Sequence, residues 1–112
     1  MTIVIKDVIK TDLAVSTEDG DTLHEVIAQN IRNGTKINID FLGLDLVATA
    51  FLNNAFGKLY KDFESSKLND FIKIINIEPF DLELLKDVRD RVLNKNLALD
   101  NILKEEFGNG KS

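Results

Sequence analysis

The sequence predicts an α/β fold in which mostly parallel strands alternate with helices. Segments rich in β-branched residues alternate along the chain with segments whose apolar residues recur every three or four positions. The order is strand, short strand, helix, strand, helix, strand, helix, helix, which favours right-handed crossovers and parallel pairing. With 112 residues, 44% of them hydrophobic and 29% charged, the chain has the size and balance of one globular domain.

The first predicted strand covers about residues 2–9, where "TIVIKDVI" is dense in β-branched residues. "KTD" turns the chain, and "LAVS" at 13–16 predicts a short second strand. "EDGD" at 18–21 is a loop signal through Gly20. We therefore expect the first helix to begin after this loop.

This first helix is amphipathic. Thr22 and Glu25 stand three positions apart, the spacing of a capping box at a helix start. His24 falls on the polar side, where we interpret it as an ordinary surface histidine. "NG" at 33–34 ends the helix, because glycine accepts the left-handed conformation common after a helix. The apolar side consists of Leu23, Val26, Ile27 and Ile31.

"KINIDF" at 36–41 alternates strictly, as expected for a half-buried strand with Ile37, Ile39 and Phe41 on one face. Gly43 opens a loop, and a helix is predicted from about Thr49. The apolar residues of this helix recur every three or four positions and form a broad stripe: Phe51, Leu52, Ala55, Phe56, Leu59 and Phe63.

The last third of the chain predicts a strand and two helices. "FIKIINI" at 71–77 fits an inner strand buried on both faces, and Pro79 stops it. A helix follows from Phe80, with Asp81 as a plausible cap. "NKN" at 94–96 breaks this helix, and "LALDNILKEEF" at 97–107 predicts a last amphipathic one. Residues 108–112, "GNGKS", predict a loose tail.

Charge and composition exclude several classes of function. Nineteen acidic and fourteen basic residues give a net charge of −5 without a basic patch, so we expect no nucleic-acid partner. There is no Cys and therefore no disulfide or thiolate site. "MTIVIKDVIK" at the start is interrupted by Lys6 and Asp7, unlike a membrane span or signal peptide. We expect a cytoplasmic protein without a membrane anchor.

No arrangement of residues predicts catalysis or a cofactor. His24 is the single histidine and has no visible nucleophile beside it. The loops hold one glycine each, which makes a phosphate-binding loop improbable. The carboxylates at 18, 19 and 21 do not match the spacing of a calcium loop. We therefore expect no enzyme, no cofactor and no metal.

Four polar residues around the 38–60 segment are candidates for binding, each with an alternative. Asp40 ends a predicted inner strand, where open α/β sheets place ligands, but it can equally accept hydrogen bonds from loop amides at 43–49. Thr49 can cap the helix or carry a phosphate. Asn53 and Asn54 can contact a partner or simply face water.

One segment resembles the STAS-like domain family of prokaryotes: the strand ending in Asp40, the loop with Gly43 and the helix "ATAFLNNAFGKLY". This family is a domain of unknown function related to the sulfate-transporter and anti-sigma-factor-antagonist fold. The resemblance covers about residues 3–93. It implies one domain over 1–107 with a four- or five-stranded, mostly parallel sheet covered mainly on one side by three or four helices. The matching residues are Asp40-Phe41, Gly43, Phe51, Phe56-Gly57 and Leu59.

The resemblance also implies a function. In anti-sigma-factor antagonists, the start of the second helix carries a Ser or Thr that a kinase of the histidine-kinase-like ATPase fold phosphorylates, which weakens docking. Here Ala48 and Ala50 stand where relatives usually have Ser, so either Thr49 replaces the missing serine as the candidate phosphosite or the switch is lost and only the docking surface remains. The expected function is a non-enzymatic signalling module that binds such an ATPase, with Leu44 and Leu46 expected to be exposed as a small apolar patch beside polar groups. The candidate partner-binding residues are Asp40, Leu44, Asp45, Thr49, Asn53 and Asn54.

Two further interpretations stay open at this point. One is an enzymatic or small-ligand-binding α/β domain with a pocket at Asp40 and His24. The other concerns assembly: the chain is expected to be a monomer or a weak homodimer, and the apolar side of 97–107 is a candidate surface for self-association.

Overall fold

The structure is a computed structural model that describes the backbone of residues 1–103 and the side chains of residues 1–94. Its main sheet has three parallel strands, β1 (Thr2–Val4), β3 (Ile37–Asp40) and β5 (Ile72–Ile75), in the order β1-β3-β5. The register aligns Ile3 with Ile39, and Ile39 with Ile74. Aligned residues of neighbouring strands point to the same face, so these isoleucines form an apolar row on the sheet.

A second, smaller parallel pair lies beside this sheet. It consists of β2 (Leu13–Ala14) and β4 (Leu46–Val47). The predicted α/β class with parallel strands is confirmed, but the strands divide into sheets of three and two instead of forming one sheet. The reason is the loop after β3: the amides of Asp45 and Leu46 both donate to the carbonyl of Asp12, at 2.8 and 3.4 Å, which leads β4 to β2.

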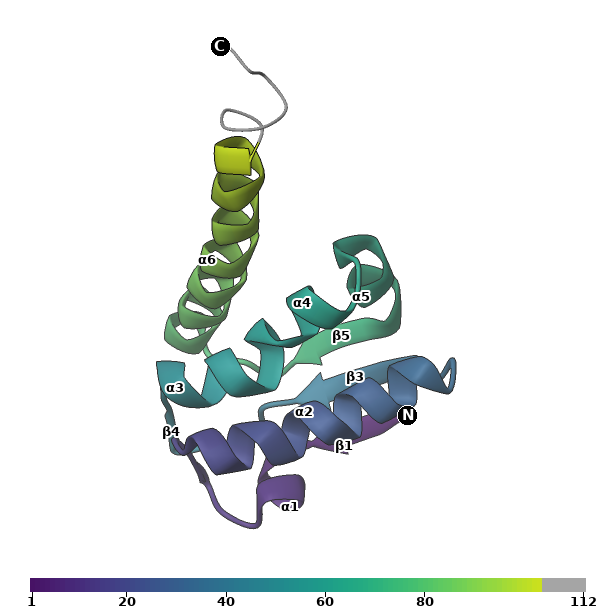
Figure 1. Cartoon of the computed structure of the whole chain (residues 1–112). Helices are drawn as coiled ribbons and strands as arrows, with labels where there is room; N and C mark the ends of the chain where they lie inside the picture. The colour runs from purple at the N-terminus through teal and green to yellow at the C-terminus, as the bar shows by residue number, and fades with distance from the viewer. Residues whose placement is uncertain (104–112) are drawn as a thin grey trace.

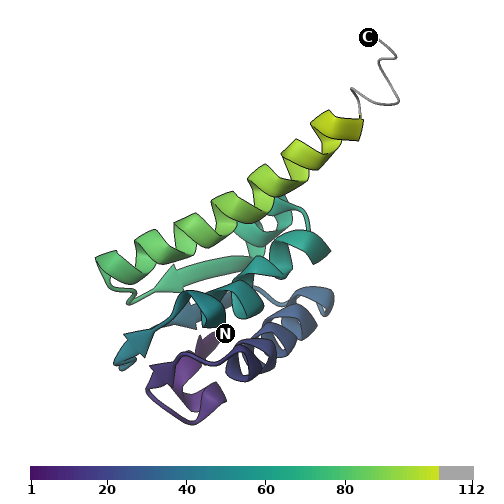
Figure 2. The same ribbon diagram turned by 60° about the vertical axis from the view of Figure 1, so that its left-hand side comes forward.

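The helices lie mainly on one face of the three-stranded sheet (Figures 1 and 2). They are α2 (Thr17–Arg32), the continuous segment α3 (Thr49–Leu52), η1 (Asn53–Gly57) and α4 (Leu59–Asp62), and α6 (Pro79–Leu103). A short α1 (Ile5–Ile9) follows β1, and α5 (Ser65–Phe71) precedes β5. Both the one-sided covering and the helix predicted from Thr49 are confirmed.

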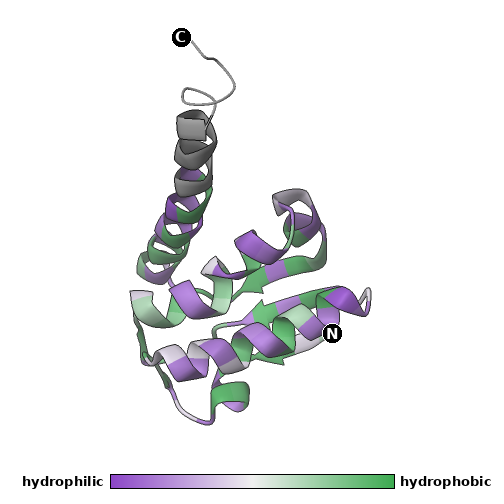
Figure 3. Cartoon of the chain, in the orientation of Figure 1, coloured by the Kyte–Doolittle hydropathy of each residue, from purple (hydrophilic) through white to green (hydrophobic). Residues whose placement is uncertain are grey.

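The core lies between the sheet and these helices. Hydrophilic and apolar residues alternate along α2, as the predicted amphipathic pattern requires (Figure 3). Leu23, Ile27, Ile39 and Phe51 are completely buried. Burying a side chain of this size stabilises the fold by roughly 1.5–3 kcal/mol, so these contacts hold the helices on the sheet.

The first predicted strand is too long. The strand ends at Val4, and residues 5–9 form α1, which Lys10 closes in the left-handed conformation (φ 65°) with its amide donating to the Lys6 carbonyl at 3.0 Å. Ile5 and Ile9 are four residues apart and both buried, which is helical spacing. Their common burial outweighs the strand preference of β-branched residues.

The first long helix begins five residues earlier than predicted. Ser16 is its N-cap and accepts a hydrogen bond from the amide of Asp19 at 3.0 Å. The residues predicted as the loop "EDGD" are therefore the first turns of α2, and Gly20 is buried inside the helix. Thr22 does not cap; its hydroxyl donates to the carbonyl of Glu18 within the helix at 3.1 Å. The predicted end is confirmed, because Gly34 follows the helix with φ 77°.

The strand predicted as buried on both faces is the edge strand β5, and the strand predicted as half-buried is the central β3. Phe71, at the start of the predicted strand, ends α5 instead, and Lys73 is exposed. The run of isoleucines shows that the segment is apolar, but the order of strands depends on contacts between distant segments.

The C-terminal helix differs from the prediction in two ways. It begins at Pro79, a residue that suits the first helical position, so Asp81 lies within its first turn and is not its cap. The segment 94–96 does not break it, because asparagine in a helix interior costs only about 0.7 kcal/mol relative to alanine. Residues 104–107 of the predicted last helix, and the predicted tail 108–112, lie outside the described residues.

Candidate functional site

The candidate site lies at the C-terminal edge of the sheet, where open parallel sheets usually place their binding sites. β3 ends here, and the chain passes through the loop 41–45 into β4 and then α3 (Figure 1). Five of the six predicted partner-binding residues come after the end of β3 in this segment, and Asp40 is the last residue of the strand.

Asp40 is a buried residue that links the ends of two strands. Its Oδ1 accepts a hydrogen bond from the amide of Leu42 at 2.9 Å and from Nδ2 of Asn76 at 3.0 Å. Asn76 follows β5 in the left-handed conformation, with φ 54°. With 9% of its surface exposed, Asp40 holds the loop after β3 against the end of β5. Of the two predicted roles, the structure supports that of an acceptor for a loop amide, but the amide is that of Leu42 and not one of the predicted amides at 43–49.

Thr49 is the first residue of α3 and does not cap it. The N-cap is Ala48, which is extended (φ −105°, ψ 151°) and has no side chain able to accept a hydrogen bond. The predicted capping role of Thr49 is therefore wrong. The amide of Ala48 pairs with the carbonyl of Ala14 at 2.9 Å, which continues the β2–β4 pairing up to the helix and places Thr49 one position inside it. Thr49 is partly exposed.

The loop residues Leu44 and Asp45 have different environments. Leu44 is half-buried and packs against the core. Asp45 is exposed, while its backbone amide binds Asp12. Gly43 makes the loop turn with φ 84°, and a Cβ there would lie 3.3 Å from Cδ of Lys6. Glycine is therefore favoured at this position for its conformation, whereas the exposed side chain of Lys6 can move to relieve the contact.

Asn53 and Asn54 lie in the π-helical turn η1 and also differ. Nδ2 of Asn54 donates to the carbonyl of Thr17 at 3.3 Å and to Oδ1 of Asp21 at 3.0 Å, so this side chain joins η1 to α2. Asn53 is exposed and remains accessible to a partner. Single π-helical turns within α-helices occur frequently at functional sites.

Lys58 supports the same contact between the two helices. Its Nζ lies 2.7 Å from Oδ1 of Asp21, and this hydrogen bond is the main reason that the pKa of Asp21 is lowered below its ordinary value. Both side chains are substantially exposed, so solvent screens the pair and its contribution to stability is small.

An exposed apolar patch lies next to Thr49, and the sequence predicted it only in part: Leu46 is exposed as expected, Leu44 is half-buried, and Leu13 and Val15 were not expected. Leu13 and Leu46 are register partners in the β2–β4 pair, and 43% and 55% of their surfaces are exposed. Val15 is two residues after Leu13 and is 36% exposed on the same side. We call Leu13, Val15 and Leu46 the apolar patch. Alternation around the buried Ala14 is the sequence signal that points Leu13 and Val15 outward.

His24 is not the surface histidine that was predicted. Only 13% of its side chain is exposed, and its Nε2 lies 3.3 Å from Oδ2 of Asp62 in α4. Its Nδ1 is buried and has no hydrogen-bond partner among the described residues. His24 therefore contacts the α4 side of the core, whereas the side chain of Asp40 contacts Leu42 and Asn76. The structure does not bring Asp40 and His24 together as an enzymatic pair would require.

The described part of the chain also bears on metal binding and on membrane insertion. No group of three or more His, Cys, Asp or Glu side chains in that part of the chain has the arrangement of a metal site. Within the same residues, no helix combines the length and the apolar character needed to cross a membrane.

Comparison with known proteins supports the resemblance seen in the sequence. The family model described as a STAS-like domain of unknown function (DUF4325) matches residues 19–81, which is more than half of the chain. The match begins in the first turn of α2 and ends in the first turn of α6, so it includes β3, the loop, the π-helical turn and β5. No curated protein and no solved structure matches the chain.

Proposed function

Because the chain belongs to the STAS-like domain family of unknown function, which is not a known enzyme family, we propose that it is a regulatory protein-binding module. Its partner is an ATPase of the histidine-kinase-like fold, as for the anti-sigma-factor antagonists that the sequence resembles. The docking surface comprises the apolar patch (Leu13, Val15 and Leu46) together with Asp45, Thr49 and Asn53.

The observation that carries this proposal is the exposure of the register pair Leu13 and Leu46 directly beside the start of α3. Exposed apolar side chains that are adjacent and have polar neighbours mark interaction sites on soluble domains. Asp45 precedes Leu46 and is exposed, and Thr49 follows it by three residues. An apolar centre with a polar rim is the usual composition of a protein interface.

The predicted partner-binding residues divide into two groups by their contacts. Asp45, Thr49 and Asn53 are wholly or partly exposed and are the groups available to a partner. Asp40, Leu44 and Asn54 are engaged within the fold and position the surface: Asp40 holds the loop, Leu44 packs beneath it, and Asn54 fixes η1 to α2. This division supports docking over a ligand pocket at Asp40.

Phosphorylation of Thr49 would change this surface strongly. A phosphate adds nearly two negative charges near neutral pH. At the first position of a helix it also lies near the positive end of the helix dipole, which stabilises it. The added charge would stand beside the apolar patch and the exposed Asp45, so docking of a partner that fits the unmodified surface would weaken.

The test is affinity capture from native lysate with the unaltered chain and with two variants. Leu46→Asp places a negative charge in the apolar patch, whereas Gln29→Glu adds the same charge on an exposed position of α2 away from the patch. We expect the unaltered chain and Gln29→Glu to retain an ATPase of the histidine-kinase-like fold, and Leu46→Asp to lose it. Retention of the same proteins by all three chains would contradict the proposed surface.

A further inference from the structure

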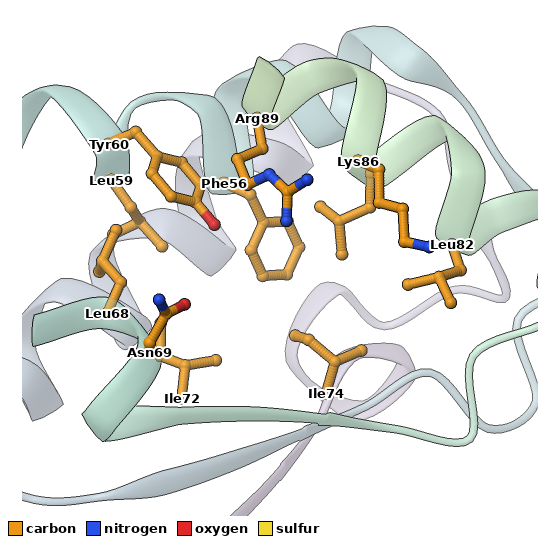
Figure 4. Close-up of a pocket in the computed structure, with 11 residues that line it drawn as sticks. Phe56, Leu59, Tyr60, Leu68, Asn69, Ile72, Ile74, Leu82, Lys86 and Arg89 are labelled. Carbon is orange, nitrogen blue, oxygen red and sulfur yellow. The ribbon is translucent and has the colours of Figure 1, made fainter. Parts of the chain in front are cut away.

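A hollow of about 190 Å³ lies between α6 and the sheet, away from the proposed docking surface (Figure 4). Its floor is apolar and includes Phe56, Leu59, Ile74 and Leu82, which come from η1, α4, β5 and α6. An apolar cavity of about 150 Å³ is large enough to bind benzene. The hollow therefore has room for one aromatic ring with a short substituent.

The polar side chains of this hollow are donors. They are Tyr60, Asn69, Lys86 and Arg89, and none of the described residues that line the hollow is acidic. Figure 4 shows the guanidinium of Arg89 and the hydroxyl of Tyr60 directed toward the centre, with the amide of Asn69 opposite them. In a chain with a net charge of −5, two cations at the wall of the hollow favour an anion there, although each also contacts a carboxylate outside the lining, Arg89 that of Asp90 and Lys86 that of Glu83.

Arg89 is held in position for such a role. Its Nε donates to Oδ1 of Asp90 at 3.1 Å, and its Nη2 lies 3.0 Å from the same oxygen. The other terminal nitrogen is left to contact a ligand. Lys86 contacts Glu83 at 3.4 Å near the entrance, where both side chains are substantially exposed, so water weakens that pair.

Tyr60 adds a hydroxyl donor. Burial of this side chain raises its pKa above the ordinary value of 10.0, against a smaller opposite effect of Arg89. The hydroxyl therefore keeps its proton throughout the neutral range and can donate a hydrogen bond to an anion.

We infer that the hollow between α4, β5 and α6 binds a small aromatic carboxylate, with its ring on the apolar floor and its carboxylate at Arg89, Tyr60 and Asn69. A guanidinium is planar and forms strong charge-assisted hydrogen bonds with carboxylates. The pairing of an apolar floor with a few convergent polar groups is the usual design of a small-molecule site. The bound molecule would contact α6 and the sheet at once and so stabilise their packing.

Phenylacetate is the probe for this site, and the chain provides its own reporter. Tyr60 is the single tyrosine, and there is no tryptophan, so tyrosine fluorescence reports only from this hollow. We expect a saturable change in emission with a dissociation constant on the order of 0.1–1 mM, given the small number of ligand atoms. The melting temperature should rise over the same concentrations, because only the folded chain binds.

Two analogues of phenylacetate test the contributions of the aromatic ring and of the charge separately, without a change in the protein. Phenylacetamide keeps the ring without the charge, and acetate keeps the charge without the ring. Each should bind at least roughly tenfold more weakly than phenylacetate, since each loses one of the two groups of contacts. Equal binding of phenylacetamide and phenylacetate, or no saturable change with phenylacetate, would overturn the inference.

A matched pair of variants tests the role of Arg89. Arg89→Gln and Arg91→Gln remove the same charge from the same helix, but Arg91 is exposed and does not line the hollow. We expect Arg89→Gln to weaken phenylacetate binding roughly tenfold and Arg91→Gln to leave it unchanged, with folding checked by circular dichroism. Equal affinities of the two variants would overturn the assignment.

A variant whose side chain fills the hollow provides a last test of ligand binding there. Leu82→Phe adds a ring to the apolar floor of the hollow and should abolish the fluorescence response while the secondary structure is retained. If the unaltered chain instead associates with itself in sedimentation experiments and Leu82→Phe prevents this association, the hollow is a contact between two copies of the chain, and the ligand inference is wrong. None of these measurements depends on the ATPase partner, so their failure leaves the proposed docking surface untouched.

Discussion

Gly20 of α2 faces the carbonyl oxygen of Phe51 in α3 so closely that no side chain fits between the two helices. A Cβ on Gly20 would lie 2.7 Å from this oxygen and 2.8 Å from Cβ of Asn54. The approach brings Asn54 within hydrogen-bond distance of Thr17 and Asp21, and so determines how α3 and η1 lie beside α2. The position of Thr49 and Asn53 on the surface depends on this contact.

Gly20→Ala should destabilise the protein by about 1–3 kcal/mol, although alanine normally favours a helix. The matched control is Gly57→Ala: a Cβ on Gly57 would lie 3.4 Å from Cγ1 of Val88, close to an ordinary contact distance. We expect this control to change stability by less than about 1 kcal/mol. Urea unfolding followed by circular dichroism measures both. A Gly20→Ala variant as stable as Gly57→Ala would refute the close approach.

The start of α2 can be located by removing hydroxyl groups. Ser16→Ala removes the acceptor for the amide of Asp19 and should lower the free energy of unfolding by about 1 kcal/mol. Thr22→Ala removes a hydroxyl that bonds only within the helix, and should have an effect near zero. The same unfolding experiment compares them. A larger loss for Thr22→Ala would restore the helix start predicted from the sequence.

We expect substitution of Asp40 to affect partner binding only through its effect on the stability of the fold. Asp40→Ala leaves the amide of Leu42 and the side chain of Asn76 without their acceptor, which should cost about 1–3 kcal/mol. Asp40→Asn keeps an oxygen in the same place and should cost less. Thermal unfolding measures the difference. If Asp40→Ala lost partner binding with unchanged stability, Asp40 would be a contact residue and not a residue that positions the loop.

The Asp21–Lys58 pair predicts a dependence of stability on pH. The pKa of Asp21 is lowered in the folded protein from its ordinary value of 3.8. Its contribution to stability is therefore present above about pH 3.8 and is lost as the pH falls through the lower, folded value. Relative to Asp21→Asn, the unaltered protein should be slightly more stable at pH 6 and should lose this advantage in strong acid. Urea unfolding at both pH values tests this, and an advantage that grows in acid would contradict it.

Thr49 offers the sharpest test of regulation. Thr49→Glu places a negative charge beside Leu46 and Asp45, and should weaken docking of the captured ATPase far more than Thr49→Ala does. Because Thr49 is not the N-cap, neither variant should lower the free energy of unfolding by more than about 1 kcal/mol. Binding of purified partner to each variant is the measurement. Equal affinities would eliminate control by phosphate at this residue.

Several elements follow from local pattern. The alternation of Ile37, Ile39 and Phe41 predicts β3, and the spacing of Leu23, Ile27 and Ile31 predicts the buried side of α2. Other elements were predicted wrongly because two local signals competed. The spacing of Ile5 and Ile9 fits either a strand or a helical turn. Ser16 and Thr22 each stand three positions before a carboxylate, so each has the spacing of a residue that caps a helix start. Burial against distant segments decided each case.

The positions of the candidate residues at the end of a strand and the start of a helix follow from the sequence, but their contacts do not. The end of β3 and the start of the next helix follow from the sequence, whereas the bond between Asp40 and Asn76 joins residues 36 positions apart. The pairing of Leu13 with Leu46 likewise joins two residues that are separated in the sequence by the whole of α2 and β3. The hollow at Arg89 requires five elements to meet, namely η1, α4, α5, β5 and α6.

The sequence by itself determined the α/β class and the parallel pairing, because periodicity records which side of each element avoids water, and the residues from Asp40 to Tyr60 carried the resemblance to the family. Tertiary structure alone decided which strand is central, which of two asparagines is free for a partner, and which leucines stay exposed. Those choices depend on contacts between segments far apart in the chain, and local spacing carries no information about the surface against which an apolar side will pack.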